Sequence, residues 1–79
     1  MTTITYTMAD VDAALREIIG DKVYDAMREC SGWSRTRAMD QAAVRCFLDQ
    51  REDRHTRVLR AALAHLNRTG VIMPDSKGE

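Results

Sequence analysis

Short breaks divide this 79-residue chain into four segments, and in each segment the apolar residues recur with the period of an α-helix. The breaks are Gly20, Ser31-Gly32, the polar run 50–53 and Gly70, and they consist of residues that end helices or form turns. The first segment is typical, because its apolar residues follow the i, i+3, i+4, i+7, i+8 pattern: Val11, Ala14, Leu15, Ile18 and Ile19. The pattern predicts a mainly all-α fold, a compact bundle of about four short helices.

Capping residues predict where these helices begin and end. Thr7 and Asp10 have the spacing of a capping box, and Asp21 is expected to cap a short second helix. Ser34 is a good N-cap for a third helix over residues 35–50, and Gly70 ends a fourth helix over residues 54–69. In the second helix, four residues are expected to face inward: Val23, Ala26, Met27 and Cys30.

The third helix is predicted to be the central, buried one. One face of it is apolar, with Met39, Ala42, Ala43, Cys46 and Phe47. Val44 and Leu48 widen that face over most of the circumference, which is typical of a helix covered on several sides.

The length predicts a single domain, with 1–8 as an extended arm, 9–73 as the helical domain and 74–79 as a flexible tail. Polar and apolar residues alternate over 3–8, which favours a short strand or extended arm. A lone strand needs a partner strand, so we expect a homodimer that pairs the arms and adds buried area.

The sequence lacks the motifs of several classes of function, which we therefore do not expect in this protein. The sequence contains no Gly-rich phosphate loop, HExxH motif or CxxC pair, and its acidic residues are scattered singly, so we expect no enzyme and no catalytic residue. The Cys and His residues match no zinc-site spacing, so we expect no metal and no cofactor: Cys30, Cys46, His55 and His65. No apolar run approaches about 18 residues and no signal peptide is evident, so we expect a cytoplasmic chain without membrane contact.

The charges are unevenly distributed although twelve basic residues balance twelve acidic ones. Residues 1–27 carry two cations against five acidic residues, whereas residues 28–68 carry nine arginines against five. Arginine is suited to binding phosphate and carboxylate groups. The alternative explanation is a genome rich in G and C, which favours Arg codons without functional meaning. The fourth helix contains no acidic residue, so one side of it is predicted to be a cationic face.

The turn Gly32-x-Ser34-Arg35-Thr36, together with the alternating residues 3–8, resembles the ribbon-helix-helix DNA-binding regulators. The resemblance covers residues 3–8 and 32–48. It implies a strand that pairs with its dimer mate and enters the major groove, and a Ser34 whose backbone amide meets a DNA phosphate. Residues 63–72 also resemble the end of a winged-helix recognition helix, which would likewise turn the fourth helix toward DNA.

The sequence therefore favours a small, non-enzymatic, DNA-binding transcriptional regulator. The expected contacts lie in the third and fourth helices: Ser34, Arg35, Arg37, Arg54, Arg57, Arg60, Asn67 and Arg68. The alternative is a small adaptor or inhibitor of the phage or mobile-element type. Such a protein would dock on an acidic or nucleic-acid-binding partner protein, and zero net charge suits it equally well.

Overall fold

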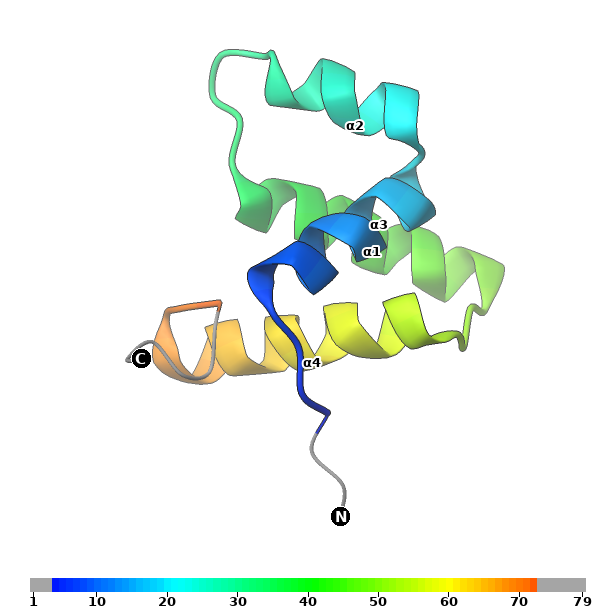
Figure 1. Cartoon of the computed structure of the whole chain (residues 1–79), viewed down its shortest axis with the longest axis vertical. Helices are drawn as coiled ribbons and strands as arrows, with labels where there is room; N and C mark the ends of the chain where they lie inside the picture. The colour runs from blue at the N-terminus through cyan, green and yellow to red at the C-terminus, as the bar shows by residue number, and fades with distance from the viewer. Residues whose placement is uncertain (1–3, 73–79) are drawn as a thin grey trace.

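The computed structural model describes residues 4–72 and contains four helices (Figure 1). They are α1 (Met8–Ile19), α2 (Asp21–Arg28), α3 (Arg35–Asp49) and α4 (Arg54–Thr69). No strand occurs within residues 4–72, so the all-α fold class and the four-helix bundle are confirmed. Residues 1–3 of the expected arm and the expected tail 74–79 lie outside the described residues, and the extended arm stays a prediction.

Side-chain caps fix the starts of three helices, α1, α3 and α4. At α1 the capping box is complete, because Thr7 Oγ1 accepts from the Asp10 amide at 3.2 Å and Asp10 Oδ2 accepts from the Thr7 amide at 2.9 Å. Ser34 Oγ accepts from the Arg37 amide at the start of α3. The expected cap at Asp21 is wrong: Gly20 is the N-cap of α2 without a side-chain cap bond, and Asp21 is the first helical residue.

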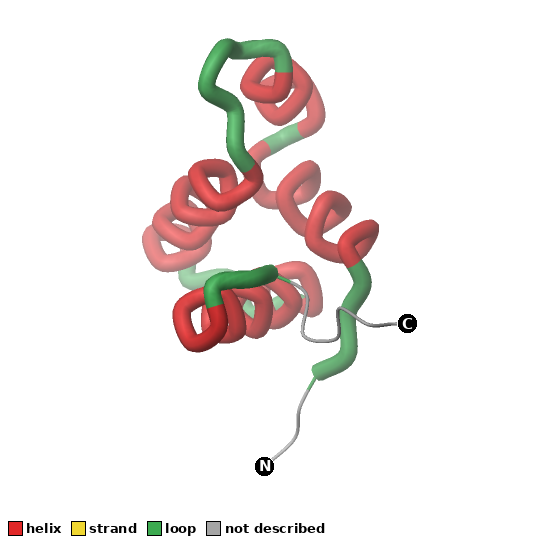
Figure 2. Tube along the Cα trace, turned by 90° about the vertical axis from the view of Figure 1, so that its left-hand side faces the viewer, coloured by secondary structure: helices red, strands yellow, loops and turns green. Residues whose placement is uncertain are grey.

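The central helix is α1, not α3 as the sequence predicted, because α1 packs against each of the other three helices. Figure 2 shows α1 and α3 side by side, α4 beneath them and α2 at the opposite end of the molecule. On α1 the core-facing residues are Val11, Ala14, Leu15 and Ile18, as the periodicity predicted. They are covered mainly by α4 and α3.

On α3, Met39, Ala42 and Cys46 face the core as predicted and Ala43 is half-buried, but Phe47 does not face the core. Its buried residues are Ala38, Met39, Ala42 and Cys46, whereas Phe47 is 76% exposed. Ala38 and Ala42 are fully buried, and both α1 and α4 pack against α3. No further helix among residues 4–72 packs on the outer side, so the large side chains there stay in solvent.

The inward side of α2 was also predicted wrongly. Tyr24 is the buried residue of α2, while Val23, Ala26 and Cys30 are exposed and Met27 is half-buried. The Tyr24 ring packs edge-on against Trp33 at 5.6 Å between centroids, and its hydroxyl donates to Asp12 Oδ1 at 3.0 Å. An aromatic ring with a polar tip suits this place because it needs both an apolar contact and a hydrogen-bond partner.

Candidate functional site

The eight residues expected to contact DNA or a partner fall into two groups on different elements. One group lies at the start of α3: Ser34, Arg35 and Arg37. The other lies on α4: Arg54, Arg57, Arg60, Asn67 and Arg68. Each group has different surroundings, and the surroundings decide which of these side chains are available to a ligand.

Arg35 is engaged inside the protein. Its Nε donates to Asp12 Oδ1 at 2.8 Å, and its Nη2 donates to Asp12 Oδ2 at 3.4 Å. Burial alone would raise the pKa of Asp12, but the hydrogen bonds from Arg35 and Tyr24 outweigh it and lower that pKa. Arg35 therefore connects the start of α3 to α1, which differs from the exposed contact that the sequence predicted.

Ser34 and Arg37 lie beside a shallow pocket of about 130 Å³ between the α2–α3 loop and α3. The pocket is also lined by Trp33 and by the exposed Cys30. Because Ser34 Oγ already accepts from the Arg37 amide at 3.1 Å, the first turn of α3 has its cap within the chain. The Arg37 side chain is exposed and takes part in no ion pair within residues 4–72.

On α4 three arginines form a narrow stripe, which we call the α4 stripe: Arg54, Arg57 and Arg68. At 100° per residue these three positions fall within about 60° of one another. All three residues are exposed, and none takes part in an ion pair with an acidic side chain within residues 4–72. Arg57 Nη1 donates to the Glu52 carbonyl at 3.2 Å, and Arg68 Nη2 lies 3.4 Å from His65 Nδ1.

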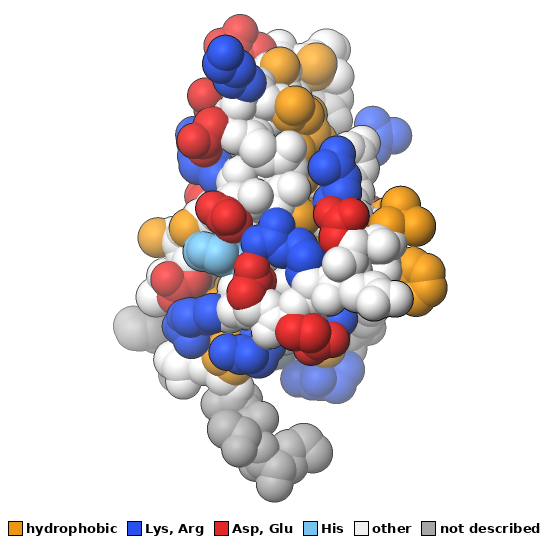
Figure 3. Space-filling view, turned by 90° about the vertical axis from the view of Figure 1, so that its right-hand side faces the viewer, with side chains coloured by type: hydrophobic (Ala, Val, Ile, Leu, Met, Phe, Trp, Pro, Cys, Tyr) orange, Lys and Arg blue, Asp and Glu red, His pale blue; other side chains and the backbone are white. Residues whose placement is uncertain are grey.

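The other two candidates on α4 flank the stripe. Asn67 is exposed in the last turn, next to Arg68. Arg60 lies on the side nearer α3 and pairs with Glu52 at 3.8 Å, although both side chains remain more than half exposed. Figure 3 shows that acidic side chains accompany the basic ones at the end of the molecule where α3 ends and α4 begins. The first turns of α4 are therefore less positive than the arginine count alone implies.

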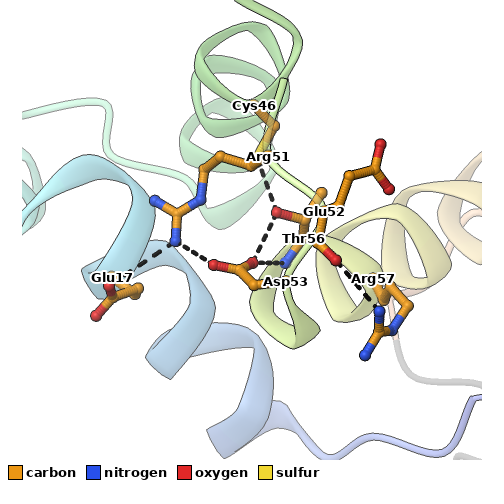
Figure 4. A network of polar contacts seen from close by, with 7 residues as sticks. All are labelled: Glu17, Cys46, Arg51, Glu52, Asp53, Thr56 and Arg57. Carbon is orange, nitrogen blue, oxygen red and sulfur yellow. Dashed lines mark hydrogen bonds and ion pairs between the residues drawn. The ribbon is translucent and has the colours of Figure 1, made fainter. Parts of the chain in front are cut away.

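A polar network that the sequence did not reveal holds the start of α4 (Figure 4). Asp53 Oδ1 accepts from both the amide and the hydroxyl of Thr56, at 3.0 and 2.9 Å, and Arg51 pairs with Asp53 and Glu17. The hydrogen bond from Arg51 and those from Thr56 lower the pKa of Asp53. Thr56 is fully buried, and its hydroxyl lies 3.7 Å from Cys46 Sγ. The network joins α1, α3 and α4 and so fixes the direction in which α4 leaves the loop.

The outer side of α3 carries a second feature that the sequence did not predict. Val44, Phe47 and Leu48 are 59%, 76% and 69% exposed, and we call these three residues the α3 ridge. Hydrophobic side chains protrude at one edge of Figure 3, beside the mixed charges. Phe47 and Leu48 line a groove of about 570 Å³ together with Gln50, Glu52 and Arg60, so the ridge adjoins the start of α4. The sequence contains one indication of the ridge. Apolar residues cover more of the circumference of α3 than its two neighbouring helices, α1 and α4, bury.

No protein-family model, curated protein or solved structure matches this chain. The resemblance to ribbon-helix-helix regulators therefore stays a prediction. Among the described residues, no helix is both long and apolar enough to cross a membrane. Within the same part of the chain, no three His, Cys, Asp or Glu side chains come together as ligands for a metal ion.

Proposed function

We propose that this chain is a small, non-enzymatic DNA-binding regulator that meets the duplex with the outward side of α4. The observation that carries the proposal is the α4 stripe: Arg54, Arg57 and Arg68 face solvent on one line of the helix, and the helix contains no acidic residue. Arginine side chains that point the same way along a helix are suited to binding the phosphates of nucleic acid.

The spacing along α4 fits this role. Arg57 and Arg68 lie about 16 Å apart along the helix axis. Between them the same side carries Ala61, Ala64 and the half-buried His65, and the two small alanine side chains let the helix axis come close to a groove. Because the major groove is about 12 Å wide, long arginine side chains at both ends of this segment reach the phosphates that border it.

The candidate residues then have separate roles. Arg54, Arg57 and Arg68 bind phosphates, and Asn67 is the side chain on this surface that is able to read a base edge. Arg60 contributes less because Glu52 partly neutralises it. Arg35 has no direct role, since its guanidinium is bonded to Asp12. Ser34 and Arg37 would serve only a duplex that also reaches the start of α3.

Fluorescence anisotropy of a mixed duplex pool at several salt concentrations tests the proposal. We expect affinity to fall steeply as salt rises, through counterion release. Replacing Arg57→Ala and Arg68→Ala together should lower the affinity and reduce the slope of log K against log salt by about 2, one unit for each lost phosphate contact.

The control variant is Lys22→Ala with Arg45→Ala, which removes the same net charge from exposed positions on α2 and α3. It should bind like the unaltered protein. Absence of salt-dependent binding would overturn the proposal, and so would an equal loss of affinity in the control. Melting curves of both variants establish that each remains folded.

A second candidate is docking of the same side of α4 on an acidic protein surface. The zero net charge favours it, as do Glu52 and Asp53 beside the first turn of α4, because both weaken attraction to a polyanion over long distances. A flat anisotropy trace at low salt would favour this candidate over DNA. Binding to an acidic protein that Arg57→Ala with Arg68→Ala abolishes, and Lys22→Ala with Arg45→Ala leaves intact, would then support it.

A further inference from the structure

The α3 ridge is the largest cluster of exposed apolar side chains on the described chain. At their exposed fractions, Val44, Phe47 and Leu48 present on the order of 300 Å² of apolar surface. The largest exposed apolar patch on a monomer is about 300–600 Å² and is often functional, and here it is made by three large side chains of one helix. The ridge lies opposite the buried side of α3, so no rotation of the helix within this fold would bury both sides.

We propose that the α3 ridge is a self-association surface, on which α3 of a second copy packs in the antiparallel direction. The residues have the spacing that helix–helix packing requires, because Val44, Phe47 and Leu48 stand at i, i+3 and i+4. A two-fold axis that crosses the ridge sets the same three side chains of each copy against those of the other.

Charge complementarity favours this occupant and this direction. Asp40 lies one turn before the ridge and is exposed, and it takes part in no ion pair within residues 4–72. Arg37, also exposed, lies on the same side of α3 as Asp40. At the other end Arg60 lines the groove beside Phe47 and Leu48, together with Glu52, with which it pairs at 3.8 Å. An antiparallel pair sets the Asp40 and Arg37 end of one copy against the Arg60 and Glu52 end of the other, so that Asp40 meets Arg60 and Arg37 meets Glu52.

The buried area indicates a reversible dimer. Two ridges together remove about 600 Å² from water, whereas stable interfaces bury at least about 1,200 Å² in total. The flanking side chains of α3 and of the groove must supply the rest, so the dimer should dissociate on dilution. This dimer differs from the one expected through the N-terminal arms, and it requires no DNA.

The first test measures mass against concentration, by light scattering behind size exclusion and by sedimentation equilibrium. The unaltered chain should rise from its monomer mass of 9.0 kDa toward twice that value as concentration increases. Phe47→Ser should stay monomeric at every concentration and keep its helix content, because the Phe47 side chain is not part of the core. The matched control is Val23→Ser, which replaces another exposed apolar side chain (53% exposed) on α2 and should dimerise normally.

The second test reverses charges. Asp40→Arg alone and Arg60→Asp alone should each raise the dissociation constant, by about tenfold for a contact of ordinary strength. The combined variant should recover most of that loss. A chain that is monomeric at all concentrations overturns the proposal, and the ridge would then face a different protein. A dimer that survives Phe47→Ser, or one that the combined charge reversal weakens further, overturns it as well.

Discussion

Replacing Tyr24→Phe tests whether the contact between α2 and the rest of the molecule depends on a hydrogen bond. The Tyr24 hydroxyl donates to Asp12 Oδ1 at 3.0 Å, and Phe keeps the edge-on contact with Trp33. A hydrogen bond to a charged group contributes about 1.5–3 kcal/mol when it is buried. Here Asp12 keeps both bonds from Arg35 and its side chain is 28% exposed, so water replaces part of the loss.

We therefore expect the free energy of unfolding to fall by about 1–1.5 kcal/mol. In a domain of this size that loss lowers the midpoint of thermal unfolding by about 4–10 °C, measurable by circular dichroism. Tyr24→Ala should cost about 3–5 kcal/mol, because it also removes the buried ring.

A double-mutant cycle with Asp12→Ala, which removes the acceptor, separates the hydrogen bond from other effects. The two substitutions should show a coupling free energy of at least about 0.5 kcal/mol, since both act on the same contact. A shift below about 2 °C for Tyr24→Phe, or strict additivity in the cycle, would refute the reasoning. In that case ring packing alone would hold α2 in place.

Three more predictions concern pH, thiol reactivity and a helix end. The pKa values of Asp12 and Asp53 are lowered below the ordinary value of 3.8 in the folded state, so their contribution to stability is complete above that value. It is lost as the pH falls through the folded pKa values, and thermal melts between pH 7 and pH 2 should show a decline that is shallower in Asp12→Asn. Cys30 is exposed and Cys46 is 2% exposed, so a thiol reagent should modify Cys30 at once and Cys46 only with unfolding; equal rates would contradict the core. Gly70→Ala should lower stability by about 1 kcal/mol in denaturant titrations, because residue 70 has φ 84° and an added Cβ meets nothing that would offset the strain.

The helix boundaries were predictable from the sequence because local chemistry determines them. The capping box at Thr7 and Asp10, the serine cap at Ser34 and the left-handed Gly70 each act within one turn of the chain. A pattern of four neighbouring residues carries all the information that such a cap needs.

The inward side of α2 and the exposure of Phe47 on α3 were not predictable in the same way. A helical period shows which residues share a side, but which side is covered depends on where the other helices lie. For α3 the covered side includes the small residues Ala38 and Ala42, which left Phe47 exposed. The role of Arg35 depends on Asp12, 23 positions earlier in the chain, and no local pattern shows such a contact. The direction of the α4 stripe followed from the sequence because α4 has one apolar and one cationic side.

The Tyr6 hydroxyl donates to the Ile72 carbonyl at 2.6 Å, across 66 positions of the chain. The first and last parts of the described chain therefore lie in contact with each other, on the same side of the molecule. A circular permutant that joins these two parts with a short linker, and opens the chain in the exposed loop at Ser31 and Gly32, should keep the same helix packing. Helix packing in this protein would then depend on which helices are present and hardly on their order along the chain.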